Sequence, residues 1–335
     1  MEKGKISGPL TSTTLLARYL NEEFIEIDKV QMFTSDKISF EHNGIEINNA
    51  SKLKFSSKNI YIVTGIFSLK ILLILFKLIL FRCDYIISLR GNLTRNAFFK
   101  KSFFKKLLYS PFIFIVLIFT KKIHYLSELE MINSFNIFRN KSFYYPNPIS
   151  IEKPIDSLTF SNDSSNRTNI NCVFIGRYDI KHKGLDNLIN FVRLNENFIC
   201  NSNIQFILYG TNYRSGIKYL NSQVKKYKLN KVITINPPLL NYYDKREVYS
   251  FADYAFHFSR YEGVPQSIVE ALSFFKKVII TTNCNIAKDE LTDGSIIVEN
   301  LDVKLIQNIL DNRFIQPTKS NLKVFNIKEF LDEIY

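Results

Sequence analysis

The sequence has few cysteines and lacks the motifs of several large enzyme classes. It contains no Gly-x-x-x-x-Gly-Lys phosphate loop, no Gly-x-Gly-x-x-Gly turn, no Gly-x-Ser-x-Gly nucleophile turn and no cluster with metal-ligand spacing. These absences argue against P-loop, dinucleotide, serine-hydrolase and metal chemistry. The four cysteines have no paired spacing and are Cys83, Cys172, Cys200 and Cys284. Their scatter favours reduced core thiols in a cytosolic protein.

Long apolar segments are also absent. The two prominent apolar runs, Ile71–Phe76 and Phe112–Phe119, fall well short of the roughly twenty residues that cross a bilayer. Residues 1–7 lack the apolar run of a signal peptide. With 335 residues, of which 46% are hydrophobic and 22% charged, the chain is expected to be globular and long enough for two domains.

Positive charge is concentrated in one segment. The formal net charge is +13, and residues 70–122 hold eleven Lys and Arg residues against one acidic residue. Within this segment Phe98–Leu108 predicts a basic amphipathic helix. Its lysines, Lys101, Lys105 and Lys106, lie opposite an arc of Phe and Leu. Such a helix can rest on an anionic membrane, although its aromatic side chains could instead face the domain core. No nucleic-acid-binding motif accompanies the charge, so no nucleic-acid partner is expected.

One stretch combines a strand, a tight turn and a helix. Tyr254–Phe258 is short, aromatic and apolar, as expected of a buried strand in a parallel sheet. Gly263 permits a sharp turn, and Pro265 suits the first position of a helix that continues to about Phe275. A helix that begins at the carboxyl end of a parallel strand points free N–H groups toward the place where α/β sheets bind ligands. We therefore expect an anion-binding site here.

Two glutamates accompany this helix. Glu262 comes just before it, and Glu270 lies about a turn and a half inside it. A carboxylate beside an anion site can bind hydroxyl groups, and phosphate plus polyol recognition indicates a nucleotide sugar. Two glutamates eight residues apart also occur by chance in many proteins, so the surrounding pattern has to decide between these interpretations.

The surrounding pattern resembles a known family. The segment Glu262–Pro265, followed by Glu270-Ala-Leu and by an expected strand at Lys277–Thr281, is similar to the Glu-x7-Glu region of the retaining glycosyltransferases of family 4. The resemblance implies that Glu262 lies beside the donor sugar and Glu270 beside the ribose of the nucleotide. It also implies the α/β GT-B fold, in which two Rossmann-like domains face a central cleft.

A second signature of that family lies upstream. Asn171–Gly176 is typical of a strand and turn, Arg177 follows, and Lys183 comes six residues later, before a helix expected at Leu185–Leu194. When a glycosyl bond to a nucleoside diphosphate breaks, negative charge accumulates on the leaving phosphate, and fixed cations stabilise it. Arg177 can bind two oxygens as a fork, and Lys183 adds a point charge. Together they can replace a metal ion, so no metal and no cofactor are expected.

The resemblance adds further donor-site positions. Gly8 follows a short expected strand that starts at Lys5, and this turn would approach the donor phosphates. Gly210 ends the strand expected at Ile204–Tyr209. The full set of expected donor-binding residues is Gly8, Gly176, Arg177, Lys183, Gly210, Glu262, Gly263, Val264 and Glu270. The three expected to be catalytic are Glu262, Arg177 and Lys183.

Arg90 is the candidate for the acceptor side. It follows an expected strand that starts at Tyr85, and the segment from Ser88 to Leu93 resembles a loop that faces the acceptor in some family members. Arg90 would then bind an acceptor phosphate or sugar; a solvent-exposed arginine after a strand is the alternative. Ser127 and Glu130 have the spacing of a helix capping box.

Proline and polar residues suggest where the domains meet. The segment 145–149 and the polar run 157–169 predict a linker near residue 150. We expect an N-terminal acceptor-side Rossmann-like domain at 1–150 and a C-terminal nucleotide-sugar-binding Rossmann-like domain at 151–317. Residues 318–335 are expected to form a helix that packs back toward the N-terminal domain, as in GT-B enzymes.

The predicted function is retaining hexosyl transfer from a nucleoside-diphosphate sugar to a membrane-linked glycan, as in capsule, O-antigen or exopolysaccharide assembly. The expected partners are the nucleotide-sugar donor, a lipid-linked or growing glycan acceptor and an anionic membrane surface. The expected location is the cytoplasm, peripherally on the inner face of the cell membrane. Two alternatives remain open at this point: a non-catalytic nucleotide-sugar-binding or scaffold subunit, and an epimerase that cleaves the same donor bond.

Overall fold

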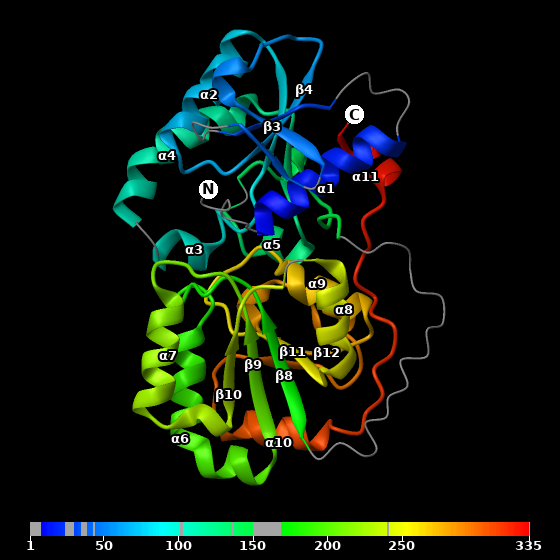
Figure 1. Ribbon diagram of the computed structural model, residues 1–335. Helices are drawn as coiled ribbons and strands as arrows, with labels where there is room; N and C mark the ends of the chain where they lie inside the picture. Colours follow the sequence, from blue (N-terminus) through cyan, green and yellow to red (C-terminus); the bar gives the residue numbers. More distant parts are fainter. Residues whose placement is uncertain are drawn as a thin grey trace. The chain divides into compact units, whose positions relative to one another are not determined.

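The structure, a computed structural model, describes residues 8–23, 30–34, 39–42, 44–100, 103–135, 137–149, 169–239 and 241–334. The chain divides into two compact units (Figure 1). The first unit comprises residues 1–149, 262–264 and 323–335, and the second comprises residues 150–261 and 265–322. Each unit is built on a parallel β-sheet with helices on its faces.

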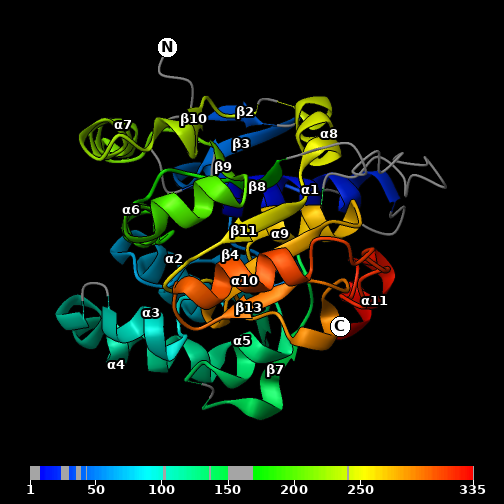
Figure 2. The ribbon, with the colours of Figure 1, turned by 90° about the horizontal axis from the view of Figure 1, so that it is seen from below.

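A six-stranded parallel sheet forms the centre of the second unit (Figures 1 and 2). Its strands are β8 (Ile170–Ile175), β9 (Ile204–Tyr209), β10 (Ile233–Asn236), β11 (Tyr254–His257), β12 (Lys277–Thr281) and β13 (Ile296–Val298). They lie in the order β10-β9-β8-β11-β12-β13. The chain first extends the sheet from β8 to one side and then from β11 to the other. In such doubly wound sheets ligands bind beyond the carboxyl ends of the strands where the order reverses, here between β8 and β11.

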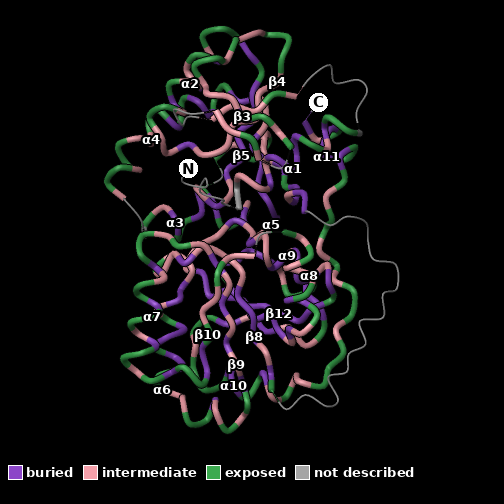
Figure 3. The backbone as a smooth tube through the Cα atoms, viewed as in Figure 1, coloured by how far each residue is buried: buried purple, intermediate pink, exposed green. Residues whose placement is uncertain are grey.

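Helices cover both faces of this sheet. They are α6 (Leu185–Asn201), α7 (Gly216–Lys226), α8 (Tyr242–Phe251), α9 (Gln266–Ser273) and α10 (Val303–Asp311). Strand β8 shows how: Phe174 packs with the apolar side chains of α6 and α7, and its neighbour Val173 packs with Val248 of α8. Successive side chains of a strand point to opposite faces, so a sheet covered twice needs almost uninterrupted apolar strands. In Figure 3 the central strands β8 and β12 are mostly buried, and the outer edges of α6 and α7 are exposed.

The first unit contains a four-stranded parallel sheet in the order β4-β5-β6-β7. Its strands are β4 (Ile60–Thr64), β5 (Asp84–Ser88), β6 (Lys122–Tyr125) and β7 (Ser142–Tyr144), and its helices are α1 (Gly8–Glu23), α2 (Leu69–Leu80), α3 (Arg95–Lys100), α4 (Phe103–Phe119), α5 (Glu128–Ile132) and α11 (Ile327–Ile334). On β5, Tyr85 and Ile87 pack toward α2 and α4, whereas Ile86 packs toward α1 and α11. The two faces of this sheet are therefore also both covered.

Two further parts complete the first unit. A small sheet of β1 (Met32–Thr34), β2 (Phe40–His42) and β3 (Ile45–Asn49) has β3 in the middle, parallel to β1 and antiparallel to β2. Helix α11 places Phe330 in a core that also contains Leu16 of α1 and Phe143 of β7. The Tyr145 hydroxyl lies 3.0 Å from the carbonyl oxygen of Asn326, just before this helix, and donates to it.

Two predictions made for the first unit are wrong. Gly8 and the next two residues are the first turn of α1, not the end of a strand and a turn; Pro9 suits this position because its fixed φ matches a helix start. Lys5 lies outside the described residues. The single amphipathic helix Phe98–Leu108 is instead divided between α3 and α4, with Lys101 outside the described residues.

The physical reason for the division is aromatic packing. The rings of Phe98 and Phe135 have centroids 5.2 Å apart, and those of Phe98 and Phe103 6.1 Å apart. Lys106 turns back toward α3 and donates to the carbonyl oxygen of Ala97. These residues therefore do not form the two opposite arcs of one continuous helix. Among the described residues, no helix combines the length and the apolar character needed to cross a membrane.

Candidate functional site

The second unit contains five of the predicted site residues. They are Gly176, Arg177, Lys183, Gly210 and Glu270. Gly176 follows β8 directly and Gly210 follows β9 directly. Because the strands are parallel, their carboxyl ends lie at the same edge, and β8 stands at the point where the strand order reverses. Of the remaining three, Arg177 and Lys183 are on the loop between β8 and α6, and Glu270 is on α9.

Close backbone contacts explain two glycines at this edge. A Cβ atom on Gly210 would lie 2.0 Å from the carbonyl oxygen of Gly176, so any side chain would push the ends of β8 and β9 apart. Gly184, next to Lys183, has φ +65°, and a Cβ there would lie 2.0 Å from the carbonyl oxygen of Phe258. Glycine thus lets the loop that carries Lys183 rest on the chain that leaves β11.

An aromatic ring orients Arg177. Its guanidinium carbon lies 4.7 Å from the ring centroid of Tyr213, in the loop after β9. A guanidinium stacks well on an aromatic face and keeps its N–H groups at the edges for anions. On the other loop, the backbone N–H of Lys183 donates to the carbonyl oxygen of Asp179 over 2.8 Å. Arg177 is thus held by a contact with a neighbouring loop, and Lys183 by a hydrogen bond within its own loop.

Arg260 ties the loop of Lys183 to the chain after β11. Its Nη1 and Nη2 atoms donate to the two carboxylate oxygens of Asp186, over 2.7 and 3.0 Å. Burial acts to raise the pKa of Asp186, but hydrogen bonds from Arg260 and Lys181 hold it below its usual value. Beside this pair, the His182 ring stacks on Tyr261 with centroids 4.3 Å apart. No pattern in the sequence indicated Arg260, because its pairing with Asp186 depends on which loops the sheet brings together.

His257 connects two parts of the site. It is buried at the end of β11, with its Nε2 atom 2.7 Å from the Ser267 hydroxyl oxygen and 3.2 Å from the carbonyl oxygen of Ile175. Ser267 lies in the first turn of α9, and Ile175 is the residue before Gly176. The helix that carries Glu270 is therefore linked to the strand that carries the glycine-arginine turn.

Helix α9 starts one residue later than predicted. Pro265 is its N-cap and Gln266 its first helical residue. Glu270 is buried on this helix, and the Nζ atom of Lys245, from α8, lies 2.8 Å from each of its two carboxylate oxygens. No spacing in the sequence indicated this pair, since its members are 25 residues apart.

Arg90 and its neighbours belong to the first unit. Arg90 has φ +49°, and its Nη1 atom donates to the Ser12 hydroxyl of α1 over 2.6 Å. Its side chain is half-buried, so the alternative of a solvent-exposed arginine is wrong. Burial lowers the pKa of Arg90 to about 10. Gly8 is the first residue of the same helix α1.

Residues 262–264 group with the first unit, although they directly precede α9. They include Glu262, Gly263 and Val264. A Cβ atom on Gly91 would lie 2.6 Å from the backbone nitrogen of Gly263, so this tripeptide lies against the turn that follows Arg90. The predicted site residues thus form two groups, one in each unit.

Glu130 lies behind the Arg90 turn. Its backbone N–H donates to the Ser127 hydroxyl over 3.1 Å, which confirms Ser127 as the cap of α5. Its carboxylate accepts from the backbone N–H of Leu126 over 2.7 Å and from that of Gly91. Burial raises the pKa of Glu130 to about 7. Among the residues that the structure describes, no three His, Cys, Asp or Glu side chains are grouped so that they could hold a metal ion.

Comparisons with known proteins agree with this architecture. Residues 159–320, just under half of the chain, match the sequence model of the family "Glycosyl transferases group 1". No match was found among curated proteins. Among solved structures, sucrose-phosphate synthase from Thermosynechococcus elongatus is similar, with a TM-score of 0.68, 14% identity and coverage of 92% of this chain and 85% of that chain.

Two further solved structures share the fold. The first is an α,α-trehalose-phosphate synthase (UDP-forming) from Burkholderia xenovorans in complex with glucose-6-phosphate, with a TM-score of 0.56, 9% identity and coverage of 82% of this chain and 69% of that chain. The second is Anabaena HepE in complex with UDP and glucose, with a TM-score of 0.54, 14% identity and coverage of 75% and 67%. The chain therefore has the α/β architecture of the GT-B glycosyltransferases, and residues 159–320 are similar to the glycosyl transferases group 1 family.

Proposed function

We propose that the chain is a retaining glycosyltransferase that moves a sugar from a nucleoside-diphosphate donor to a membrane-linked glycan. One observation carries the donor half of this proposal. Gly176, Arg177, Lys183 and Gly210 follow the carboxyl ends of β8 and β9, and Glu270 lies on the helix that follows β11, in a segment that matches the glycosyl transferases group 1 model. The similarity to HepE, whose structure contains UDP and glucose, supports a nucleotide sugar as the donor.

The proposed chemistry needs cations at the leaving group. As the bond from the anomeric carbon to the diphosphate breaks, charge builds on the phosphate oxygens. Cations and hydrogen-bond donors of the protein that are already in place stabilise this charge more than they stabilise the ground state. Arg177 is oriented by Tyr213 and would bind phosphate oxygens with its fork. Lys183 would add a second cation, and this arrangement would work without a divalent metal.

The two glutamates would divide the donor between them. Glu262 would lie against the donor sugar, where a same-face, oxocarbenium-like transition state keeps the anomeric configuration. Glu270 would hold the ribose hydroxyls. On the acceptor side, Arg90 would bind a phosphate or sugar of the acceptor, and Gly8 would lie near the donor phosphates.

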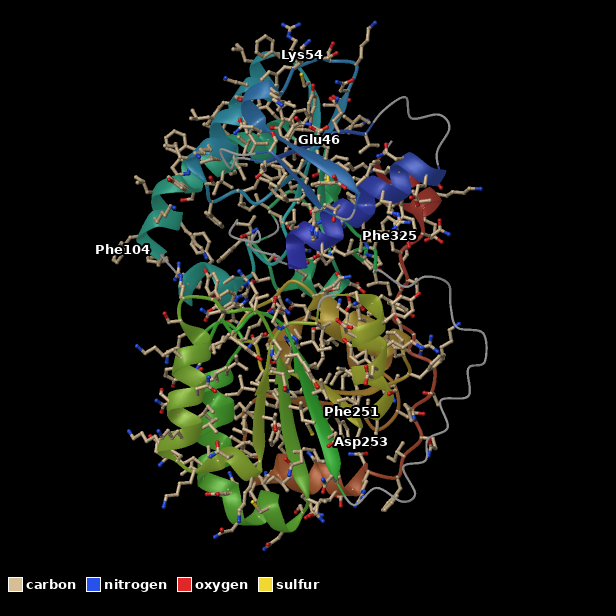
Figure 4. All side chains as sticks on the ribbon, in the orientation of Figure 1. Glu46, Lys54, Phe104, Phe251, Asp253 and Phe325 are labelled. Carbon is tan, nitrogen blue, oxygen red and sulfur yellow. The ribbon has the colours of Figure 1, made fainter. Side chains whose placement is uncertain are left out.

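The membrane part of the proposal rests on helix α4. Ile113, Val116 and Leu117 are buried on one side of it. Its exposed apolar side chains are Phe104, Leu107, Leu108, Phe112, Phe114, Ile115, Ile118 and Phe119. We call these eight residues the α4 apolar face. Phe104 is 84% exposed and projects away from the ribbon at the start of α4 (Figure 4).

Such a face needs a partner. A helix that is apolar on its outer side as well as its inner side is typical of contact with another surface. Residues 70–122 carry eleven Lys and Arg residues and one acidic residue, so the surroundings of this face are basic. A basic, aromatic-rich surface fits the interface of an anionic bilayer. An enzyme held there would meet a lipid-linked acceptor.

The decisive experiment is a transfer assay. Purified protein would be incubated with a panel of radiolabelled nucleoside-diphosphate sugars and with lipid-linked glycan extracts, and the anomeric configuration of the product would be read by NMR. Transfer with retention supports the proposal. Binding of a donor without transfer to any extract favours the non-catalytic subunit. Release or epimerisation of the donor sugar without an acceptor favours the epimerase.

A further inference from the structure

Lys245 and Glu270 form an ion pair in which the carboxylate is buried and the lysine is partly exposed. Lys245 Nζ lies 2.8 Å from both carboxylate oxygens, and the side chains are 22% and 5% exposed, respectively. Helices α8 and α9, which carry them, are also joined by the Tyr249 hydroxyl, which donates to the carbonyl oxygen of Ser267 over 2.8 Å. The lysine is therefore held on the carboxylate by the packing of two helices.

The hydrogen bonds from Lys245 leave acceptor directions on the carboxylate for hydroxyl groups. Each carboxylate oxygen has two lone-pair directions, and Lys245 uses one on each oxygen. A pair of neighbouring hydroxyls could donate to the remaining directions while the ion pair stays intact. A lysine beside the carboxylate thus need not block ligand binding.

The charge of the pair matters for a phosphorylated ligand. The phosphates of a nucleoside diphosphate are attached to the same ribose that carries the hydroxyls. A lone buried carboxylate at the ribose would therefore repel the phosphates, and this repulsion would be strong because water screens buried charges poorly. A carboxylate neutralised by lysine keeps its hydrogen-bond acceptors but has no net charge.

We propose that Lys245 is a positioning residue for the donor: it holds the Glu270 carboxylate toward the ribose and cancels its charge for the adjoining diphosphate. This inference rests on the proposed donor-binding function. It assigns Lys245 a part in selecting ligands by their charge, beyond the role of Glu270 itself. A lysine needed only for packing of α8 on α9 would affect charged and uncharged ligands alike.

The test compares each nucleoside diphosphate with its parent nucleoside. UDP, GDP and ADP, with uridine, guanosine and adenosine, would be titrated by calorimetry into the full chain at pH 8 and low salt. The readout is the ratio of the nucleoside dissociation constant to that of the diphosphate, which removes effects common to both ligands. If the wild-type chain binds none of the diphosphates, the proposed donor site is wrong, and this inference fails with it.

If a diphosphate binds, Lys245→Met should lower this ratio by about tenfold, and Lys245→Arg should restore most of it. The double variant Lys245→Met/Glu270→Gln removes both charges and should return the ratio toward the wild-type value. Lys225→Met, an exposed lysine on α7, serves as the control and should leave the ratio unchanged. Thermal unfolding would establish that each variant is folded.

Two results would overturn the inference. One is a wild-type ratio in Lys245→Met, even if both ligands bind more weakly, because this indicates a packing role. The other is a ratio in the double variant that stays as low as in Lys245→Met, because the repulsion would then not come from Glu270.

Discussion

The Nε2 atom of His124 lies 2.7 Å from the backbone carbonyl oxygen of Tyr145. A carbonyl oxygen only accepts, so this ring nitrogen carries the proton. On the other side of the ring, Nδ1 lies 2.9 Å from the Ser88 hydroxyl oxygen. Burial lowers the pKa of His124 to about 4, so the ring is neutral and Nδ1 accepts from Ser88. His124 is thus a fixed core residue of the sheet.

His124 and Glu130 should give opposite pH dependences of stability. The pKa of His124 is lowered from 6.5 to about 4, so its contribution is complete above pH 6.5 and is lost as the pH falls toward 4. The pKa of Glu130 is raised from 4.5 to about 7, so its contribution is complete below pH 4.5 and is lost as the pH rises through 7. Each residue contributes about 3 kcal/mol to the free energy of unfolding. Between pH 6.5 and 4.5 the two contributions change in opposite directions and offset one another.

Glu130→Gln should therefore lose stability more steeply than the wild type as the pH falls from 6.5 to 4.5. His124→Gln should show the opposite change, a shallower loss or a gain. The measurement is the free energy of unfolding from urea titrations at several pH values in this range. The comparison uses slopes, because either substitution also changes the absolute stability. Equal slopes in all three proteins would contradict the opposing contributions.

Replacing either predicted cation should slow the reaction. Arg177→Ala or Lys183→Ala should lower kcat/KM by an amount equivalent to about 2.7–4 kcal/mol of transition-state stabilisation, as for loss of one oxyanion donor. Arg193→Ala is a matched control, because Arg193 also stacks on a tyrosine, Tyr227, but on exposed α6 surface. The assay is steady-state transfer with and without EDTA. Unchanged turnover in a variant removes that residue from the site, and a loss with EDTA that magnesium restores contradicts the metal-free mechanism.

The two glutamates should separate in their kinetics. Glu262→Gln should mainly lower kcat, because its contact with the donor sugar would strengthen in the transition state. Glu270→Gln should mainly raise KM for the donor, because ribose binding is the same in the ground and transition states. Steady-state kinetics with a matched donor and acceptor measure both, with the exposed Glu247→Gln as control. Equal loss of kcat with unchanged donor KM in both variants would contradict the proposal that Glu262 and Glu270 have different roles.

The α4 apolar face should bind anionic vesicles. Phe104→Ser should weaken binding to phosphatidylserine-containing vesicles by about 1.5–3 kcal/mol if this side chain inserts fully. The control is Phe314→Ser in the second unit, because Phe314 is 80% exposed and Phe104 is 84% exposed.

Lys105→Glu should weaken vesicle binding by about 1 kcal/mol or more and make it less sensitive to salt. Its control is Lys226→Glu on α7. Both lysines are exposed and lie over a neighbouring tyrosine ring. Failure of the wild-type chain to bind at low salt would refute this contact.

Local sequence patterns were sufficient to predict several strands and loop starts of the second unit. The strands Ile204–Tyr209 and Lys277–Thr281 have the predicted bounds. Their signals are contained within a few residues, because each strand is a short run of mostly apolar side chains. Glycine and proline near the ends of β8, β9 and β11 likewise marked where loops begin.

Features that depend on tertiary packing were not predicted. The pairing of Lys245 with Glu270 follows from the way α8 and α9 lie together, and no periodicity encodes it. The break between α3 and α4 depends on Phe135, which is distant in sequence from Phe98 and packs on it. The periodicity of residues 98–108 contains no information about this contact. The predicted and observed starts of α9 differ by one residue at Pro265, which is the usual uncertainty of a helix end.

Helix α11 has a consequence for the order of events during biosynthesis. Its side chains Ile327, Phe330, Leu331 and Ile334 share a core with α1 and β5, which are made far earlier. Domains generally fold as their sequence leaves the ribosome, and nearly all of the second unit emerges before residue 327. The first unit must therefore wait, with this face of its sheet covered only in part by α1, until α11 has been synthesised. A nascent chain stalled before that point would expose this face to chaperones, although its second unit could already be folded.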